Sequence, residues 1–205
     1  MLAIASVGAV APVSASPPSG AARAQPVMPA AYYGMVEAER SDMLLREVVL
    51  GMHNEERQSL GLAPLAWDSA LAQDAARYAR QMATTNRFQH SARASRTVPS
   101  GENLWMGPRR LYAYDTMIGA FLDEKRLFRR VGKLPDISSS GRWEDVGHYT
   151  QMIWRGTRKV GCAVAEGQND DYLVCRYFPA GNSFGKAPLD EDDSPRTTQF
   201  AGVGE

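Results

Sequence analysis

The chain has 205 residues, of which 44% are hydrophobic, and its 23 basic and 23 acidic residues cancel. This length predicts one domain with tails, and this composition is sufficient for a buried core. The zero net charge gives no reason to expect a nucleic acid or an anionic membrane as partner. No nucleotide-binding loop, nucleophile motif or nucleic-acid-binding module is found in the sequence.

The N-terminal region has the composition of an export signal. Residues 1–31 carry one charged residue, Arg23, and open with an apolar run that Pro12 interrupts. The run is shorter than the ~20 residues that a membrane span needs, and small-residue cleavage motifs follow it. We therefore expect a signal peptide over 1–24 and a linker over 25–40. A plain Ala/Pro-rich leader is the alternative, because the basic residues that usually open a signal are missing.

The C-terminal region differs from the middle of the chain. Residues 185–205 show no apolar periodicity and contain the acidic run DEDD. Such a segment cannot bury enough apolar surface to fold, so we expect a disordered acidic tail. The folded domain is thereby predicted over residues 41–184.

Three segments show apolar residues at helical spacing. The first begins near Ser41 and has a stop signal at Gly61. The second begins after Asp68, a predicted N-cap, and ends at the sequence TTN. The third is predicted over 115–128, with Asp115 as its cap. The sequence LAPLAW, between the first two helices, is expected to be a loop.

Two β-rich segments, KVGCAVAE and DYLVCRYFP, flank the polar turn GQNDD and predict an antiparallel hairpin. The two cysteines, Cys162 and Cys175, lie a few residues from this turn on opposite strands. Facing positions would bring them within disulfide range. A disulfide is expected if the protein is exported, and two buried thiols if it stays in the cytosol. With GENLW as a third strand, the element order predicts an α+β layered domain.

Three histidines are the candidates for chemistry. His53 falls beside the apolar stripe of the first helix, which favours a packing role. His90 and His148 lie outside the predicted helices. Imidazole titrates near neutrality and binds transition metals, but no H-x-x-H or H-E-x-x-H motif joins these residues. From spacing alone, a structural histidine is the favoured interpretation at each position.

Four segments, in this order, resemble the CAP superfamily of cysteine-rich secretory proteins, insect venom antigens and plant pathogenesis-related proteins. They are HNEERQSLGLAPLAWDSALAQDAARYA, HSARASRTVPSGENLW, GHYTQMIWRGTRKVGCAVA and YLVCRYFPAGNSFGKAP. The resemblance covers about residues 43–184. It implies a three-layer α-β-α sandwich with a central, short antiparallel sheet.

The resemblance also implies a cleft lined by two histidines and two acidic residues. Matched residue by residue, these are His90, Glu102, His148 and Glu124. Glu124 is matched through the sequence FLDE, with Phe121 in the family's aromatic position. Asp123 and Glu144 are the alternatives to Glu124.

A cleft of this kind predicts a weak, exchangeable Zn²⁺ site. Zinc takes four ligands in structural sites, so His90 and His148 alone would leave positions open for water or an external group. Glu102 and Glu124 would hydrogen-bond those waters or orient the imidazoles. Affinity should fall as the histidines protonate.

Two functions compete. The resemblance implies a secreted or periplasmic binding protein whose ligand is a sterol or fatty acid, or else an extracellular or envelope macromolecule. Lipid binding in the family is tied in part to the loop at 129–142, which mixes apolar residues with four basic ones. The alternative is a metal-dependent hydrolase or peptidase, in which zinc-bound water attacks and a glutamate is the base. The family does not imply a general enzymatic activity, so we favour binding.

Overall fold

The structure, a computed structural model, describes residues 36–190. The predicted signal peptide at 1–24 lies outside the described residues, as do the linker up to residue 35 and the part of the predicted 185–205 tail from residue 191 onward. Residues 185–190 of that tail are described and lie against the domain, where Leu189 packs near Tyr149 and the Pro188 carbonyl accepts the Arg155 N–H. None of the helices within 36–190 has the length and apolar character needed to cross a bilayer.

The described chain contains four α-helices and four strands, which confirms the α+β class. The helices are α1 (Asp42–Ser59), α2 (Ser69–Thr85), α3 (Tyr114–Leu122) and α4 (Gly147–Met152). The strands are β1 (Ala66–Trp67), β2 (Gly101–Pro108), β3 (Lys159–Glu166) and β4 (Asp170–Phe178). Short 3₁₀ helices lie at Arg93–Ser95, Asp123–Leu127 and Trp143–Val146.

The first two helices begin and end where the sequence predicts. Ser41 caps α1, with its side chain accepting a hydrogen bond from the Leu44 N–H, and Gly61 follows the helix with a φ of +68°. Asp68 caps α2 through its carboxylate, which accepts two backbone N–H groups. Asn86, in the left-handed conformation, ends α2.

The third helix differs from its prediction. It begins one residue early, at Tyr114, and its N-cap is Ala113, so Asp115 lies in the first turn and is not the cap. The α-helix ends at Leu122 and continues as the 3₁₀ turn Asp123–Leu127. Tertiary contacts explain the change, because Glu124 in this turn hydrogen-bonds α4.

The strands form one sheet in the order β1-β3-β4-β2. The β3–β4 hairpin and the β2–β4 pair are antiparallel, as predicted. The LAPLAW segment is not wholly a loop, because its last two residues form β1, which pairs in parallel with β3. This strand is too short for a periodic pattern, and only its pairing with β3 reveals it.

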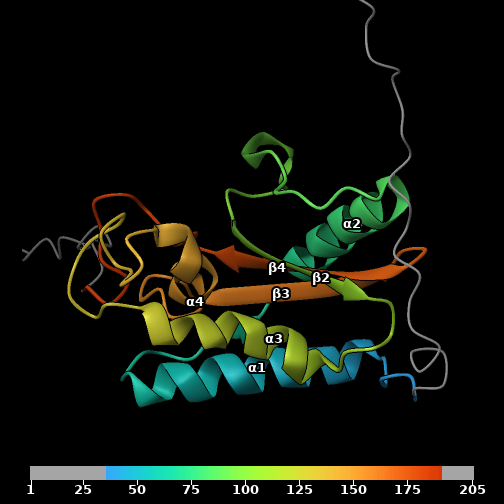
Figure 1. Cartoon of the computed structure of the whole chain (residues 1–205), viewed down its shortest axis with the longest axis horizontal. Helices are drawn as coiled ribbons and strands as arrows, with labels where there is room; N and C mark the ends of the chain where they lie inside the picture. The colour runs from blue at the N-terminus through green and yellow to red at the C-terminus, as the bar shows by residue number, and fades with distance from the viewer. Residues whose placement is uncertain (1–35, 191–205) are drawn as a thin grey trace, which may run out of the picture. The chain divides into compact units, whose positions relative to one another are not determined.

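The elements are stacked in three layers, with α2 on one face of the sheet and α1 and α3 on the other (Figure 1). Alternate residues of the central strand β4 therefore enter different cores. Tyr172 and Val174 pack with α2, whereas Leu173, Cys175 and Tyr177 pack with α1 and α3. This explains why β4 is buried along almost its whole length.

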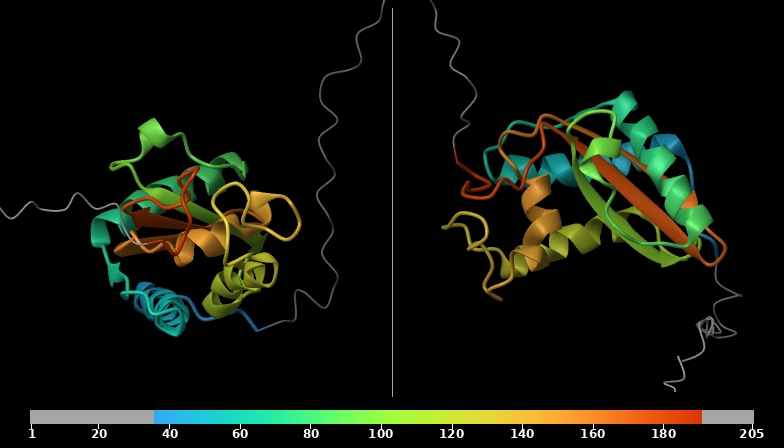
Figure 2. Two further views of the ribbon diagram at one scale, coloured as in Figure 1. Left: turned by 90° about the vertical axis from the view of Figure 1, so that its left-hand side faces the viewer. Right: turned by 90° about the horizontal axis from the view of Figure 1, so that it is seen from above.

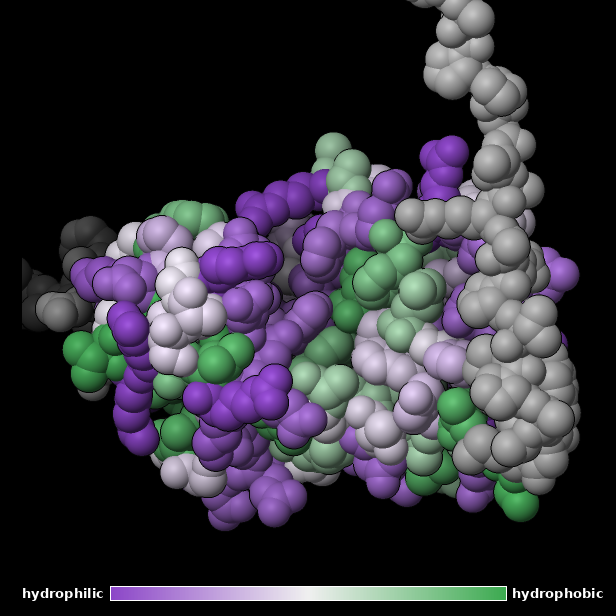
Figure 3. Space-filling view, in the orientation of Figure 1, coloured by the Kyte–Doolittle hydropathy of each residue, from purple (hydrophilic) through white to green (hydrophobic). Residues whose placement is uncertain are grey.

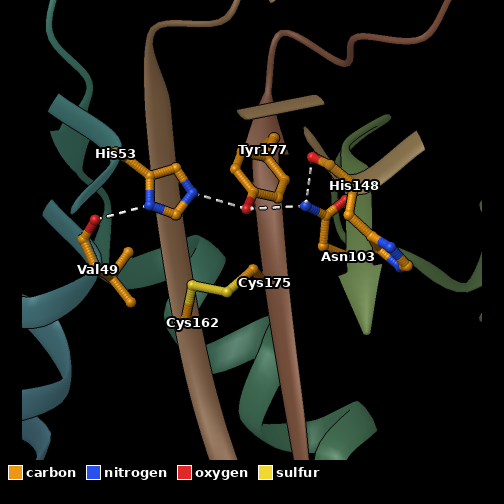
Figure 4. The surroundings of a disulfide bond; sticks show 7 residues. All are labelled: Val49, His53, Asn103, His148, Cys162, Cys175 and Tyr177. Carbon is orange, nitrogen blue, oxygen red and sulfur yellow. Dashed lines mark hydrogen bonds between the residues drawn. A yellow bond between two sulfur atoms is a disulfide. The ribbon is translucent and has the colours of Figure 1, made fainter. Parts of the chain in front are cut away.

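The predicted disulfide joins Cys162 to Cys175, which face each other across β3 and β4 with their Cα atoms 4.1 Å apart. The bond lies in the core between the sheet and the helix α1 (Figure 4). No free cysteine remains in the chain, which contains two in all.

Candidate functional site

An open cleft of about 640 Å³ lies at the start of β2. Four segments line it: the loop after α2, the first residues of β2, the α4 region and the chain that follows β4. Three of the four residues predicted for the site, His90, Glu102 and His148, are part of its wall. The fourth, Glu124, is not part of the wall but lies 2.5 Å from the Nδ1 of His148.

His90 reaches the cleft from the α2 side of the sheet. Its Nδ1 lies 2.7 Å from the Glu102 carboxylate, which is buried while the imidazole is 62% exposed. Glu102 also accepts hydrogen bonds from the Ser91 N–H and hydroxyl, and from Arg96 and Arg176. Because an ionised carboxylate only accepts, the His90 Nδ1 carries the proton.

Hydrogen bonds and nearby arginine charges keep Glu102 ionised. Burial alone would raise the pKa of Glu102, but hydrogen bonding to His90 and the charge of Arg176 hold it below its usual value. Arg176 is itself buried and also donates to Asp74 at 2.9 Å. This network reaches from α2 across β4 to β2, so it fixes Glu102 to the framework of the domain.

His148 reaches the cleft from the other side, at the start of α4. Its Nδ1 lies 2.5 Å from Glu124 Oε1, while Glu124 Oε2 accepts the backbone N–H groups of His148 and Tyr149. The imidazole stacks on Phe121, with ring centroids 4.8 Å apart. Glu124, rather than Asp123 or Glu144, is therefore the acidic partner of His148.

A buried hydrogen-bond chain supports the backbone at His148 (Figure 4). The Asn103 amide donates to the His148 carbonyl and to the Tyr177 hydroxyl, at 3.0 and 3.3 Å. Tyr177 lies 2.9 Å from His53 Nε2, and His53 Nδ1 lies 2.7 Å from the Val49 carbonyl. Since a carbonyl accepts, His53 Nδ1 donates and Nε2 accepts from Tyr177.

His53 is a structural residue, as its helical position predicts. It is fully buried, and this burial lowers its pKa to about 4, against the opposing effect of its hydrogen bond to Val49. The imidazole is therefore neutral at physiological pH, consistent with the acceptor role of its Nε2.

The two cleft histidines share one arrangement. In each, a carboxylate holds Nδ1, which leaves the lone pair of Nε2 for a metal ion or a hydrogen-bond donor. No group of three or more His, Cys, Asp or Glu side chains is positioned to hold a metal within residues 36–190. Within the described residues, the cleft therefore offers a metal at most two imidazole ligands, His90 and His148.

Arg176, Asp74 and Arg96 are site-supporting residues that the sequence reasoning missed. Arginine in the middle of a fully buried strand is the one signal that could have pointed to them, because a buried guanidinium requires carboxylate partners. Asn103 was also missed, although it follows Glu102 directly in the sequence.

The family model of the cysteine-rich secretory proteins, CAP, matches residues 50–177. The chain belongs to the CAP family. Relatives of known name include pathogenesis-related protein 1C of Nicotiana tabacum, 34% identical over 140 residues that make up 68% of this chain and 77% of the relative. GLIPR1-like protein 1 of Bos taurus is 33% identical over 153 residues, 66% of this chain and 59% of the relative.

Solved structures of CAP proteins have the same fold. A crystal structure of NaASP2 with Zn²⁺ aligns with a TM-score of 0.61 at 27% identity, covering 76% of this CAP chain and 90% of NaASP2. BmVAL-1 aligns with a TM-score of 0.62 at 23% identity, covering 75% and 85% of the two chains.

The loop at 129–142 has more internal anchors than its sequence predicts. Leu134 and Ile137 are buried with Val146 and Trp154 in a small core of their own. Val131 is 87% exposed, and the basic side chains of the loop are also exposed. The apolar residues of the loop thus mostly stabilise the loop itself.

Proposed function

We propose that this CAP protein is an exported binding protein that holds a divalent metal ion on His90 and His148 and uses it to bind an extracellular macromolecule. The observation that carries the proposal is the matched pairing of each imidazole Nδ1 with a carboxylate, on opposite sides of one open cleft. Zinc bound there would supply a positive centre with open coordination positions.

The contacts of the glutamates favour binding over hydrolysis. A general base needs a carboxylate oxygen that can take a proton from water. Glu102 accepts from four residues, and Glu124 accepts from one imidazole and two backbone amides. Both carboxylates therefore accept hydrogen bonds that fix the shape of the cleft, and neither is free to take a proton from water. Hydrolysis is the alternative, and it predicts chelator-sensitive peptidase activity that Glu102→Gln removes.

The character of the cleft favours a macromolecule over a sterol or fatty acid. Ten of its sixteen lining residues are polar or charged, although apolar atoms supply most of the wall's exposed surface. The apolar residues Leu134 and Ile137 of the neighbouring loop are buried away from solvent. The disulfide and the secretory family description support export, to the exterior or the periplasm. Solvent extraction and mass spectrometry of protein from its native compartment test this choice. A lipid recovered at one per protein would contradict it.

Zinc titration by calorimetry tests the metal site. His90→Ala and His148→Ala should each weaken zinc binding at least tenfold, since each removes one of two protein ligands. Arg93→Ala is the matched control, because it alters the cleft wall without removing a ligand. Unchanged affinity in both histidine variants would refute the metal site.

A further inference from the structure

The strand β2 forms an open edge of the sheet. It pairs with β4 on one side, and the sheet order places no strand on its other side. Among residues 36–190, no backbone hydrogen bond links Trp105, Met106 or Gly107 to anything but β4. The views in Figures 1 and 2 place this edge on the side that faces the reader in Figure 1. An open edge of this kind can pair with an added strand.

An apolar groove of about 450 Å³ runs between this edge and α3. Trp105 and Tyr112 form one wall, with their rings edge to face at 5.5 Å, and the small residues Gly119 and Ala120 of α3 form the other. Gly107 makes this possible, because a Cβ there would collide with the Trp105 ring. In Figure 3, apolar surface occupies the middle of this face.

The groove and the histidine cleft are connected by the same strand. Residues 101–103 of β2 line the cleft, and residues 105–108 line the groove. The eight residues of β2, at ~3.4 Å each, span about 27 Å. Pro108 has no N–H and its carbonyl accepts the Leu111 N–H, so residues 101–107 are the part of the edge that an extended peptide could pair with. A ligand paired along β2 would therefore touch both features.

We propose that the ligand is an extended peptide segment of a partner protein, which adds antiparallel to the outer edge of β2 and ends in a carboxylate at the histidine cleft. This peptide site rests on the proposed function, since the peptide carboxylate would bind the metal ion held by His90 and His148. Main-chain hydrogen bonds to β2 supply affinity, and an apolar side chain in the groove supplies selectivity.

Charge complementarity sets the direction of the peptide. β2 runs from the cleft to the groove, so an antiparallel strand has its C-terminal end at the cleft. A metal ion on two neutral imidazoles is positive, and Arg93 in the cleft wall has no ion-pair partner among the described residues. Glu102 and Glu144 are the acidic groups in the wall, and Glu102 is already paired with Arg96 and Arg176. Zinc accepts carboxylate oxygen as a ligand, which makes a carboxylate the matching terminus.

Fluorescence anisotropy with a synthetic probe tests the proposal. The probe is a dye-labelled octapeptide of alternating valine and threonine, preceded by two lysines for solubility, made with a free carboxylate and as the amide. With zinc present, the carboxylate form should bind the full chain at least tenfold more tightly than the amide. A chelator should remove that difference.

Ala120→Trp fills the groove from an exposed helix position and should weaken both peptides at least tenfold. Ala70→Trp, equally exposed on α2, is the matched control and should change nothing. Equal affinity of wild type and Ala120→Trp, or of the carboxylate and amide forms, overturns the proposal.

Three further outcomes separate this proposal from the alternatives. Normal zinc binding without peptide binding overturns the peptide site and leaves the metal site intact. If the wild type does not bind zinc, the proposed function itself is refuted. A dimer in sedimentation that Ala120→Trp dissociates, and that the peptide does not, would assign the edge to a second copy of this chain and overturn the proposal.

Discussion

Arg176→Met should destabilise the domain strongly, because it removes the one cation shared by two buried carboxylates. The Arg176 side chain is 2% exposed and forms ion pairs with Asp74 and Glu102, whose side chains are 6% and 1% exposed. Removing one member of a buried ion pair costs about 3–5 kcal/mol, since the remaining charge keeps its desolvation penalty. A domain of this size is stable by about 5–15 kcal/mol, so much of its stability would be lost.

Urea denaturation at pH 7, followed by fluorescence, measures this effect. Arg77→Met is the matched control, because Arg77 pairs with the same Asp74 but has a side chain that is 56% exposed. Exposed ion pairs contribute at most about 1 kcal/mol. Costs under 1 kcal/mol for both variants would refute the idea that Arg176 anchors the site.

The same network predicts how stability changes in acid. Burial raises the pKa of Asp74 and of Glu102, but the hydrogen bonds and arginine charges around them outweigh it and leave both lowered. Stability from a lowered carboxyl pKa is complete above the unfolded value of about 4 and is lost as pH falls below it. Arg176→Met should make this acid dependence shallower, as denaturation between pH 5 and 3 would show.

Three further predictions concern the framework of the domain. Replacing Cys162 and Cys175 by alanine should cost about 3 kcal/mol in urea denaturation, from loop closure over a separation of 13 residues; no change would indicate a bond that does not constrain the unfolded chain. The lowered pKa of His53, about 4, implies that stability falls by up to about 3 kcal/mol as pH drops from 6.5 to 4, because only the unfolded chain takes up the proton. His53→Gln should flatten that slope, and an unchanged slope would contradict the assignment. Gly161→Ala should cost about 1–3 kcal/mol by thermal melting, because its Cβ would collide with the α2 backbone at Ala72; a neutral effect would mean that α2 can move aside.

Local chemistry made much of the framework predictable. Ser41 and Asp68 cap their helices with side chains that lie next to the groups they satisfy, and a cap needs no knowledge of the rest of the fold. The hairpin turn set the register that brings Cys162 opposite Cys175. The four cleft residues came from the family resemblance, since His148 and Glu124 lie far apart in the sequence. Which glutamate holds which histidine became known only from the structure.

Long-range contacts account for what the sequence did not reveal. α3 ends at Leu122, and the turn that follows brings Glu124 within hydrogen-bond distance of the first residues of α4. The apolar periodicity along α3 cannot reveal this contact. Arg176 pairs with Asp74 across 102 positions of the chain, and no local pattern links them. The open edge of β2 becomes visible only when the strand order is known.

Nitrogen NMR of the histidine side chains during a zinc titration tests the central claim most directly. Zinc should shift the Nε2 resonances of His90 and His148 and leave their Nδ1 atoms protonated, because the glutamates hold those protons. His53, fully buried, should not respond. Zinc-induced shifts at Nδ1, or no shift at either cleft histidine, would contradict a metal site built from these two imidazoles.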